Sequence, residues 1–264
     1  MNEAKEPRAK SGPRVRQVPA VTRAIAILRL LARGSEPLAL KTIAQELDMV
    51  TSTCLHILRV LVDEGLVKVD AGSKRYALGT GILTLARSVI ESNSFPALVQ
   101  PVLDRLSKEA NVTAIGVEIA DQDHMVVLAL SRSHAPFRLH VDVGSRFPAL
   151  ISATGRLVAA HTEMSDADIE RRFKALRWDQ PPDIEAWRKD VDTARRKGYS
   201  IDRGNYIDGV TVLAVPVINR HGRLTHALVA AALSTQLNAS KAQTLAKELQ
   251  NEARALSQLL TMRD

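Results

Sequence analysis

Side chains that could hydrogen-bond to a nucleic acid are concentrated between Thr51 and Glu64. Apolar residues recur there at the i, i+3, i+4, i+7 spacing of a helix face directed at a core, at Cys54, Ile57, Leu58 and Leu61. Hydroxyl, imidazole and guanidinium groups on the other faces suit base edges and phosphate oxygens. The candidates for such contacts are Thr51, Ser52, Thr53, Leu55, His56 and Arg59. Plain solvated surface is the alternative interpretation.

Two residues of this segment have a second interpretation each. Leu55 is unusual on a solvated face, where it could contact a thymine methyl group or pack beneath a neighbouring hairpin. Cys54 is expected to be a small buried hydrophobe, because burial raises the pKa of a thiol and blunts its reactivity. A redox sensor is the less favoured alternative. Since Cys54 is the only cysteine, an internal disulfide and a cysteine-based zinc site are excluded.

A second group of candidates suits a small acidic ligand. Ser152, Ala153, Thr154 and Gly155 are predicted to open a helix, whose unpaired N–H groups and positive dipole end favour a carboxylate. An ordinary helix start with small residues for close packing is the alternative. Polar residues gather again before a predicted strand, at Tyr199, Asp202, Arg203, Asn205 and Tyr206. Arg203 could be the counter-ion of an acid or form an intradomain salt bridge. Leu150 and Leu213 could wall an apolar pocket or belong to the core.

Catalytic and metal-binding signatures are not found in the sequence. There is no Gly-x-Ser-x-Gly elbow, no Walker loop and no Gly-x-Gly-x-x-Gly. The seven histidines include no His-x-x-x-His pair. We therefore expect no enzyme activity, no catalytic residues, no metal and no cofactor.

The elements that would position the first group describe a winged helix-turn-helix. Helices are predicted at Val21–Arg33, with Thr22 as N-cap, at Leu40–Leu47 and at Thr51–Glu64, the last ended by Gly65. Alternation then predicts a hairpin of Leu66–Asp70 and Arg75–Leu78. In such a fold the third helix can enter a major groove about 12 Å wide. Candidate phosphate contacts, or else solvated charges, are Arg23, Lys41, Lys74 and Arg75.

The excess of positive over negative charge is concentrated in the same part of the chain. Of the 264 residues, the first 80 contain 13 Lys and Arg against 8 Asp and Glu, and residues 1–17 read as a disordered basic arm. Such an arm fits a polyanionic partner or a solubilising tail. No apolar run approaches the about 20 residues that span a bilayer, and the N-terminus has no apolar core of a secretory signal. We expect no membrane association and a cytoplasmic location.

The remaining chain is predicted to form a connector and an α+β domain. Residues 18–79 would be the DNA-binding domain, and residues 80–94 a linker helix whose apolar stripe serves packing or dimerisation. Residues 95–264 alternate helices and strands, and we expect helices on one face of a mainly antiparallel sheet. One of the strands is expected at Phe137–Val143. In the first predicted helix, Val21–Arg33, we expect the core face to consist of Ile25, Leu28, Leu31 and Ala32.

Several separated motifs resemble the IclR family of transcriptional regulators, in the family's order and spacing. They are VTRAIAILRLLARGSEPLALKTIAQELDMVTSTCLHILRVLVDEGLVKVDAGSKRYALGTGILTLA, VDVGSRFPALISATGRLVAA, KGYSIDRGNYIDGVTVLAVPV and the closing helix. The resemblance implies a winged helix-turn-helix, a linker helix and a GAF-like mixed α/β effector-binding domain. The sequence departs from the family pattern at Thr51, His56 and Asn205, where lysine, arginine and an acidic residue are common.

This resemblance implies a ligand-responsive regulator that binds double-stranded operator DNA as a homodimer or homotetramer. Its expected effector is a small molecule, with a carboxylate favoured. Its expected target is a catabolic operon for a small organic or aromatic acid. A repressor is favoured over an activator. The alternative is a constitutive DNA-binding protein whose C-terminal domain ignores ligands.

Overall fold

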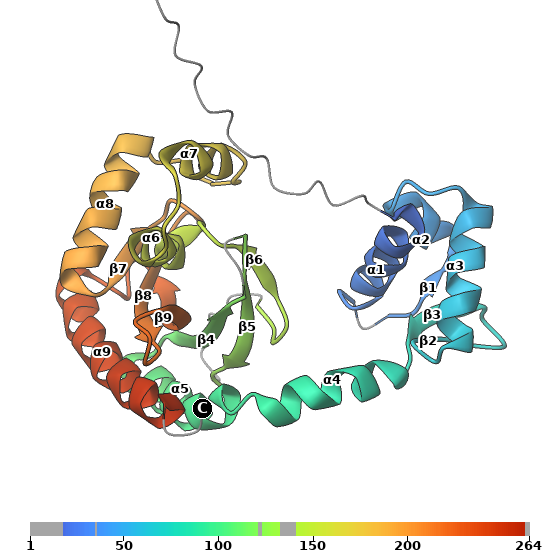
Figure 1. Cartoon of the computed structure of the whole chain (residues 1–264), viewed down its shortest axis with the longest axis horizontal. Helices are drawn as coiled ribbons and strands as arrows, with labels where there is room; N and C mark the ends of the chain where they lie inside the picture. The colour runs from blue at the N-terminus through green and yellow to red at the C-terminus, as the bar shows by residue number, and fades with distance from the viewer. Residues whose placement is uncertain (1–17, 35, 121–122, 133–140, 262–264) are drawn as a thin grey trace, which may run out of the picture. The chain divides into compact units, whose positions relative to one another are not determined.

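The computed structural model describes residues 18–34, 36–120, 123–132 and 141–261 (Figure 1). The predicted basic arm at residues 1–17 and most of the predicted strand at 137–143 lie outside these ranges. Contacts divide the chain into two compact units, Met1–Ser92 and Asn93–Asp264. In the described ranges, no helix is both long enough and apolar enough to cross a membrane.

The first unit is a winged helix-turn-helix, as expected. Its elements are α1 (Pro19–Leu31), β1 (Leu38–Ala39), α2 (Leu40–Glu46), α3 (Thr51–Asp63), β2 (Val67–Val69), β3 (Arg75–Leu78) and α4 (Gly81–Ser92). The three strands form an antiparallel sheet in the order β1-β3-β2, to which β1 is an addition that the sequence did not suggest. Gly65 has φ 69°, so it ends α3 in the left-handed conformation that was predicted.

The predicted start of α1 is wrong, and its predicted core face is right for Leu28 and Leu31, which pack in the core, but wrong for Ile25 and Ala32, which are exposed. The helix begins two residues earlier, with Val18 as N-cap and Pro19 in the first turn, where a missing N–H is no disadvantage. Thr22 therefore lies inside the helix. The buried residues are Ile27, Leu30 and Leu31, whereas Ile25 is 41% exposed.

The second unit is a mixed α/β domain built on one antiparallel sheet in the order β6-β5-β4-β9-β8-β7. Its strands are β4 (Thr113–Ile119), β5 (His124–Leu130), β6 (Arg146–Pro148), β7 (Ser200–Arg203), β8 (Val210–Ile218) and β9 (Leu224–Leu233). Its helices are α5 (Phe95–Ala110), α6 (Ser152–His161), α7 (Asp166–Lys174), α8 (Ile184–Lys197) and α9 (Ala239–Thr261). The strands β6 and β7 were not predicted, and residues 141–143 are not in a strand.

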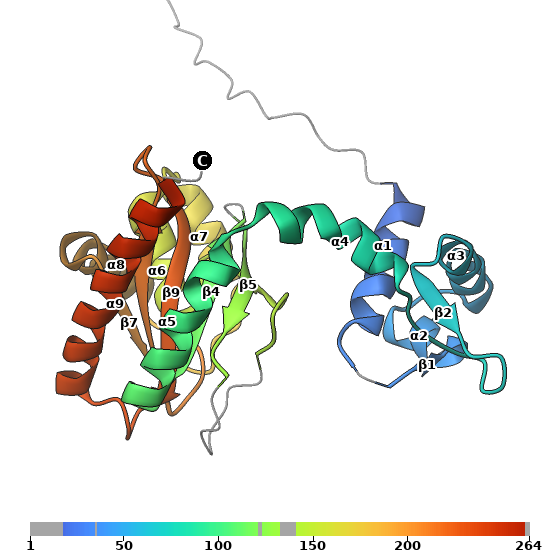
Figure 2. The same ribbon diagram turned by 90° about the horizontal axis from the view of Figure 1, so that it is seen from below.

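Helices cover both faces of this sheet, which corrects the expectation of a single covered face. Figure 2 shows α5 and α9 side by side over one face, and they share a core with Leu213, Val215 and Leu228 of the sheet. The other face packs against α6, and the same core includes Phe173 of α7 and Trp187 of α8. Both faces of β8 and β9 are therefore buried, so the strands read as near-continuous apolar runs.

The helix α4 contributes no buried residue to the first unit. Its apolar stripe includes Leu85, Val89 and Ile90, each more than 60% exposed within the single chain. The predicted apolar side of this helix is thus present, and it is not covered by the described part of its own chain.

Candidate functional site

The first candidate site is the outward face of α3. Cys54, Leu58 and Leu61 are buried against α1 and α2, which confirms the predicted core face. Cys54 is fully buried, and this burial raises the pKa of its thiol. The opposite face is left to the side chains of Thr51, Ser52, His56 and Arg59, which are all exposed, while Thr53 and Leu55 are half-buried.

This face satisfies the geometric demands on a recognition helix. The turn between α2 and α3 contains Asp48 at φ 47°, a left-handed conformation that lets the chain reverse within a few residues. The first turn of α3 carries Thr51 and Ser52, the part of a recognition helix that contacts base edges. Arg23 on α1 and Lys41 on α2 are exposed cations in the same unit.

The hairpin tip adds two further basic residues. Asp70 accepts hydrogen bonds from the backbone N–H and the hydroxyl of Ser73, and these bonds lower the pKa of its carboxyl group. Lys74 has φ 54° and closes the turn by donating its N–H to the Asp70 carbonyl. The Arg75 guanidinium donates to the Pro37 carbonyl at 3.1 Å, so part of its hydrogen-bonding capacity is used inside the unit.

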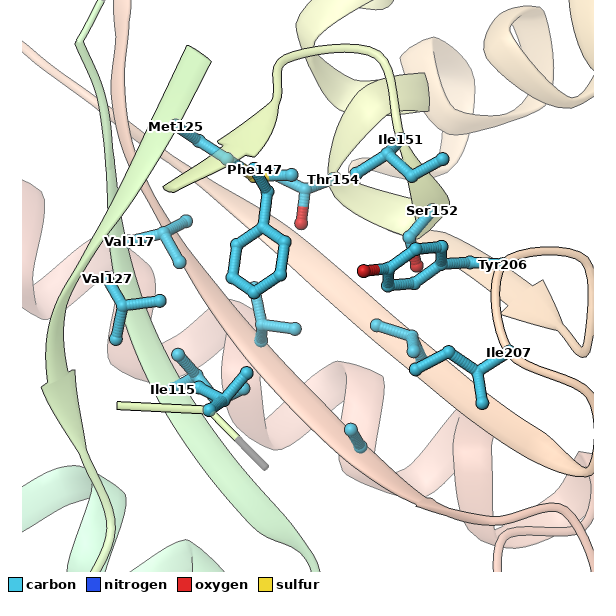
Figure 3. A pocket seen from close by; sticks show the side chains of 14 residues that line it. Ile115, Val117, Met125, Val127, Phe147, Ile151, Ser152, Thr154, Tyr206 and Ile207 are labelled. Carbon is cyan, nitrogen blue, oxygen red and sulfur yellow. The ribbon is translucent and has the colours of Figure 1, made fainter. Parts of the chain in front are cut away.

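The second candidate site is a cavity of about 230 Å³ between the sheet and the N-terminus of α6 (Figure 3). Its wall is apolar apart from three hydroxyl-bearing residues, Ser152, Thr154 and Tyr206. The apolar lining comes from Ile115, Val117, Met125, Val127, Val141, Phe147, Ile151, Ile207, Val212, Val229 and Ala231. Figure 3 shows the Tyr206 hydroxyl pointing into the space between its own ring and Phe147, with the Thr154 hydroxyl directed into the same space.

The polar end of this cavity is the first turn of α6. The first helical hydrogen bond runs from Gly155 N to Ile151 O, so the N–H groups of the three preceding residues have no acceptor within the helix. Ser152 has φ 58°, and its buried Oγ has no hydrogen-bond partner in the described structure. Unsatisfied buried hydroxyls are uncommon and suggest a missing partner. This end of the cavity is therefore suited to an acceptor group such as a carboxylate oxygen.

Gly155 allows this turn to lie close to the preceding chain. A Cβ atom at this position would be 2.0 Å from the carbonyl carbon and oxygen of Leu150, which are backbone atoms and cannot rotate away. Burial raises the pKa of the Tyr206 hydroxyl, with a smaller contribution from Asp179, so this group stays a neutral donor at physiological pH.

A buried ionic cluster lies behind the α6 turn. The side chain of Arg156 is 1% exposed, and its Nη1 donates to the Ser152 carbonyl at 3.0 Å and to Asp202 Oδ2 at 3.3 Å. Its Nη2 donates to Asn205 Oδ1 at 2.9 Å, and its Nε donates to Asp190 Oδ2 at 3.2 Å. Arg156 and Asn205 also border a separate polar cavity of about 390 Å³, together with Lys197 and Arg203.

The structure brings together only some of the residues predicted for the acidic ligand. Ser152 and Thr154 line the apolar cavity. Leu150, Ala153 and Gly155 are buried behind it. Asp202 and Asn205 belong to the cluster around Arg156, whereas Arg203 is exposed beside the polar cavity, away from the apolar one.

Of the two alternatives for Leu213, the structure supports the core and not the wall of the apolar cavity. Leu213 lies on the opposite face of the sheet, in the core with α5 and α9, because neighbouring strand residues point to opposite faces. Val212, the residue before it, takes that place.

The cavity residues that the sequence did not reveal come mainly from strands and loops. Phe147 and Ile207 are apolar residues next to polar ones, where nothing local assigns them to a cavity, and Arg156 was not among the predicted site residues. Strand alternation predicts that Met125 and Val127 point to the same face of their strand. Only the pairing of β4 with β5 places Val117 beside them around one space. Within the described ranges, no group of three or more His, Cys, Asp or Glu side chains could hold a metal ion.

Comparisons with known proteins identify the family of both units. The family profile described as "IclR helix-turn-helix domain" matches residues 20–71, and that described as "Bacterial transcriptional regulator IclR C-terminal" matches residues 88–258. A glycerol operon regulatory protein of Streptomyces griseus is 29% identical over 206 residues, 78% of this chain and 81% of that protein. The transcriptional repressor IclR of Escherichia coli K12 is 23% identical over 225 residues, 82% of this chain and 81% of that protein.

The fold is shared with a solved regulator. The crystal structure of an IclR transcriptional regulator from Alicyclobacillus acidocaldarius superposes with a TM-score of 0.77 at 26% identity, covering 92% of this chain and 99% of that one.

Proposed function

Because this chain belongs to the IclR family of bacterial transcriptional regulators, we propose that it is a ligand-responsive regulator that binds a specific operator sequence. One observation carries the ligand-responsive part. An apolar cavity in the second unit ends at the α6 N-terminus, where the Ser152 hydroxyl is buried without a partner. A chain that only bound DNA would gain nothing from this apolar cavity with its polar end.

We propose that α3 lies in the major groove of double-stranded DNA. Thr51, Ser52 and His56 are placed to contact base edges, and Arg59 to contact a base or a phosphate, since all four are exposed on one side of the helix. Thr53 and Leu55 are at the margin of this face. Further phosphate contacts are assigned to Arg23, Lys41, Lys74 and Arg75.

We propose that the effector is a small organic or aromatic acid. Its carboxylate would accept hydrogen bonds from the first N–H groups of α6 and from Ser152 Oγ, and its apolar body would fill the space between Phe147 and the sheet. A volume of about 230 Å³ is below the usual range of about 300–1,000 Å³ for drug-sized ligands, which favours a small molecule. Thr154 and Tyr206 can donate to, or accept from, a second polar group on the ligand.

The regulated genes are proposed to form a catabolic operon for such a compound, with repression favoured. A relative that is a glycerol operon regulatory protein and one that is a transcriptional repressor support this proposal. The exposed apolar stripe of α4 supports a homodimer or homotetramer, because uncovered apolar stripes of this kind mark interfaces. The protein would act in the cytoplasm, and no catalytic role or cofactor is assigned.

Effector binding would change DNA affinity only if the effector binds the DNA-competent and DNA-incompetent conformations unequally. By linkage, DNA would then change effector affinity by the same factor. A constitutive DNA-binding protein is the alternative function, and it predicts a coupling factor of one.

The DNA assignment is tested by fluorescence anisotropy on the chain's own upstream intergenic DNA, with scrambled DNA of the same length as control. His56→Ala and Arg59→Ala are each expected to weaken specific binding by about 1–3 kcal/mol if they contact bases. Lys74→Ala is expected to lower the salt dependence by about one unit, equally on both DNAs. Equal affinity of the unaltered protein for upstream and scrambled DNA would contradict operator recognition at this site.

A further inference from the structure

The α6 turn that forms the polar end of the cavity is held in an unusual conformation. Ser152 is a non-glycine residue at φ 58°, a region that side chains with a Cβ atom rarely occupy. Such a conformation persists only where the surrounding structure fixes it. Ser152 and Thr154 line the cavity in the geometry described above only while this conformation is kept.

Arg156 supplies one of the contacts that fix this turn. Its Nη1 donates to the carbonyl oxygen of Ser152 itself, at 3.0 Å, so the guanidinium holds the peptide plane that follows the strained residue. Ser200 Oγ donates to the next carbonyl, that of Ala153. Both carbonyls are thereby tied to side chains that border the polar cavity and do not line the apolar one.

The same guanidinium also holds a second wall of the cavity. Its Nη2 donates to Asn205 Oδ1 at 2.9 Å, and its Nη1 contacts Asp202 Oδ2 at 3.3 Å. The other oxygen of Asp202 accepts the backbone N–H groups of Asn205 at 2.9 Å and of Tyr206 at 3.4 Å. The loop that places Tyr206 and Ile207 against the cavity is therefore joined to the α6 turn through one side chain.

A structural ion pair alone would not require this arrangement. A buried Arg–Asp pair contributes little net stability, and apolar side chains of similar volume often replace such a pair without loss. Here the donors of the guanidinium reach Ser152, four residues before Arg156, and Asn205, 49 residues after it, and the segments that contain both residues line the apolar cavity.

We propose that Arg156 is a positioning residue that sets the geometry of the effector cavity, by locking the Ser152 turn and the Asn205–Ile207 loop relative to each other. The consequence is that Arg156 determines how well the cavity binds a carboxylate, and this consequence rests on the proposed function. Arg156 itself does not touch the effector, because it lies behind the turn and does not line the cavity.

Hydrogen–deuterium exchange of the full chain tests the locking directly and needs no ligand. In Arg156→Met, peptides covering residues 150–156 and 203–209 are both expected to exchange at least about tenfold faster, because opening of the two segments is no longer opposed by shared hydrogen bonds. Peptides of β4 and β9 are expected to change only by the loss of global stability that urea unfolding measures for the variant, because Arg156→Met also leaves Asp202 without its buried partner. The matched control is Arg195→Met, which removes a guanidinium bonded to the Ala160 carbonyl at the other end of α6 and is expected to change neither segment.

Binding of benzoate and of its uncharged analogue benzamide, measured by calorimetry, tests the consequence. Arg156→Met is expected to weaken benzoate binding about tenfold and benzamide binding much less, since the carboxylate depends more on aligned donors. Arg156→Lys is expected to fall between, because an ammonium group cannot reach Ser152, Asp202 and Asn205 at once. It also serves as the test variant if the methionine variant does not fold.

Unchanged exchange in both segments of a folded Arg156 variant would overturn the proposal. So would faster exchange that is equal throughout the unit, since that is the result of a merely structural role. If the unaltered protein binds neither benzoate nor benzamide, the carboxylate assignment under the proposed function is contradicted, and the exchange experiment still decides the role of Arg156.

Discussion

Replacing Asp202 by asparagine should destabilise the second unit strongly. The Asp202 side chain is fully buried, and it is the one fully buried anion that contacts Arg156 in the described structure. An asparagine could still accept the N–H groups of Asn205 and Tyr206 through its oxygen. Its NH₂ group would then face the Arg156 guanidinium across about 3.3 Å, so two donors would meet and the buried cation would lose its partner.

The magnitude follows from the burial of the pair. Removing one member of a buried ion pair costs about 3–5 kcal/mol. Asp190 remains beside Arg156 Nε at 3.2 Å, and because its side chain is 54% exposed it compensates the charge only in part. We therefore expect a loss of about 3 kcal/mol, which for a unit of this size lowers Tm by about 6–12 °C.

Tryptophan fluorescence, excited selectively over tyrosine, measures this loss in the second unit during urea unfolding. Both tryptophans of the chain, Trp178 and Trp187, lie in the second unit, so the signal is silent for the first. Asp190→Asn is the matched control, because it makes the same substitution at a carboxylate that contacts the same guanidinium but is solvated. We expect this variant to lose less than about 1 kcal/mol of unfolding free energy. The reasoning is refuted if Asp202→Asn is as stable as the unaltered protein, or if the two variants lose equal stability.

Three further outcomes are expected. Gly155→Ala should lose about 3 kcal/mol or more in the same urea assay, because its Cβ would meet the Leu150 backbone at 2.0 Å; an unchanged midpoint would contradict this packing. Cys54 should react with Ellman's reagent far more slowly in the native protein than in urea, since it is fully buried, and equal rates would show that α3 is not packed as described. The raised pKa of Tyr206 means that above about pH 10 the unfolded state releases its phenol proton first, so stability should fall with rising pH more steeply than in Tyr206→Phe; parallel pH curves would contradict its burial.

Sequence reasoning succeeded where a periodic pattern had only one solution. In α3, Cys54, Leu58 and Leu61 fix a single core face because polar residues interrupt the other faces. In α1, the consecutive run from Ala24 to Leu28 is apolar throughout, so periodicity could not choose between phases, and the predicted face included the exposed Ile25 in place of the buried Ile27.

The second unit shows a different limit. Because both faces of β8 are buried, its sequence does not reveal that Val212 and Leu213 face different cores. The cluster around Arg156 depends on contacts with residues 46 and 49 positions away, which no local pattern encodes. The α6 turn was found because small residues at a helix start carry a local signal, but its unpartnered Ser152 hydroxyl is visible only in the folded chain.

The most direct test of the central claim is the change that a ligand makes in operator affinity. Fluorescence anisotropy on the upstream DNA would be repeated with each of a panel of small carboxylates, for the unaltered protein and for Ala231→Leu, which fills the cavity from β9. We expect one acid to shift the Kd for the operator by at least about fivefold, and the shift to be lost in the variant. An acid that binds the protein to saturation by calorimetry and leaves operator affinity unchanged would contradict the account and favour a constitutive DNA-binding protein.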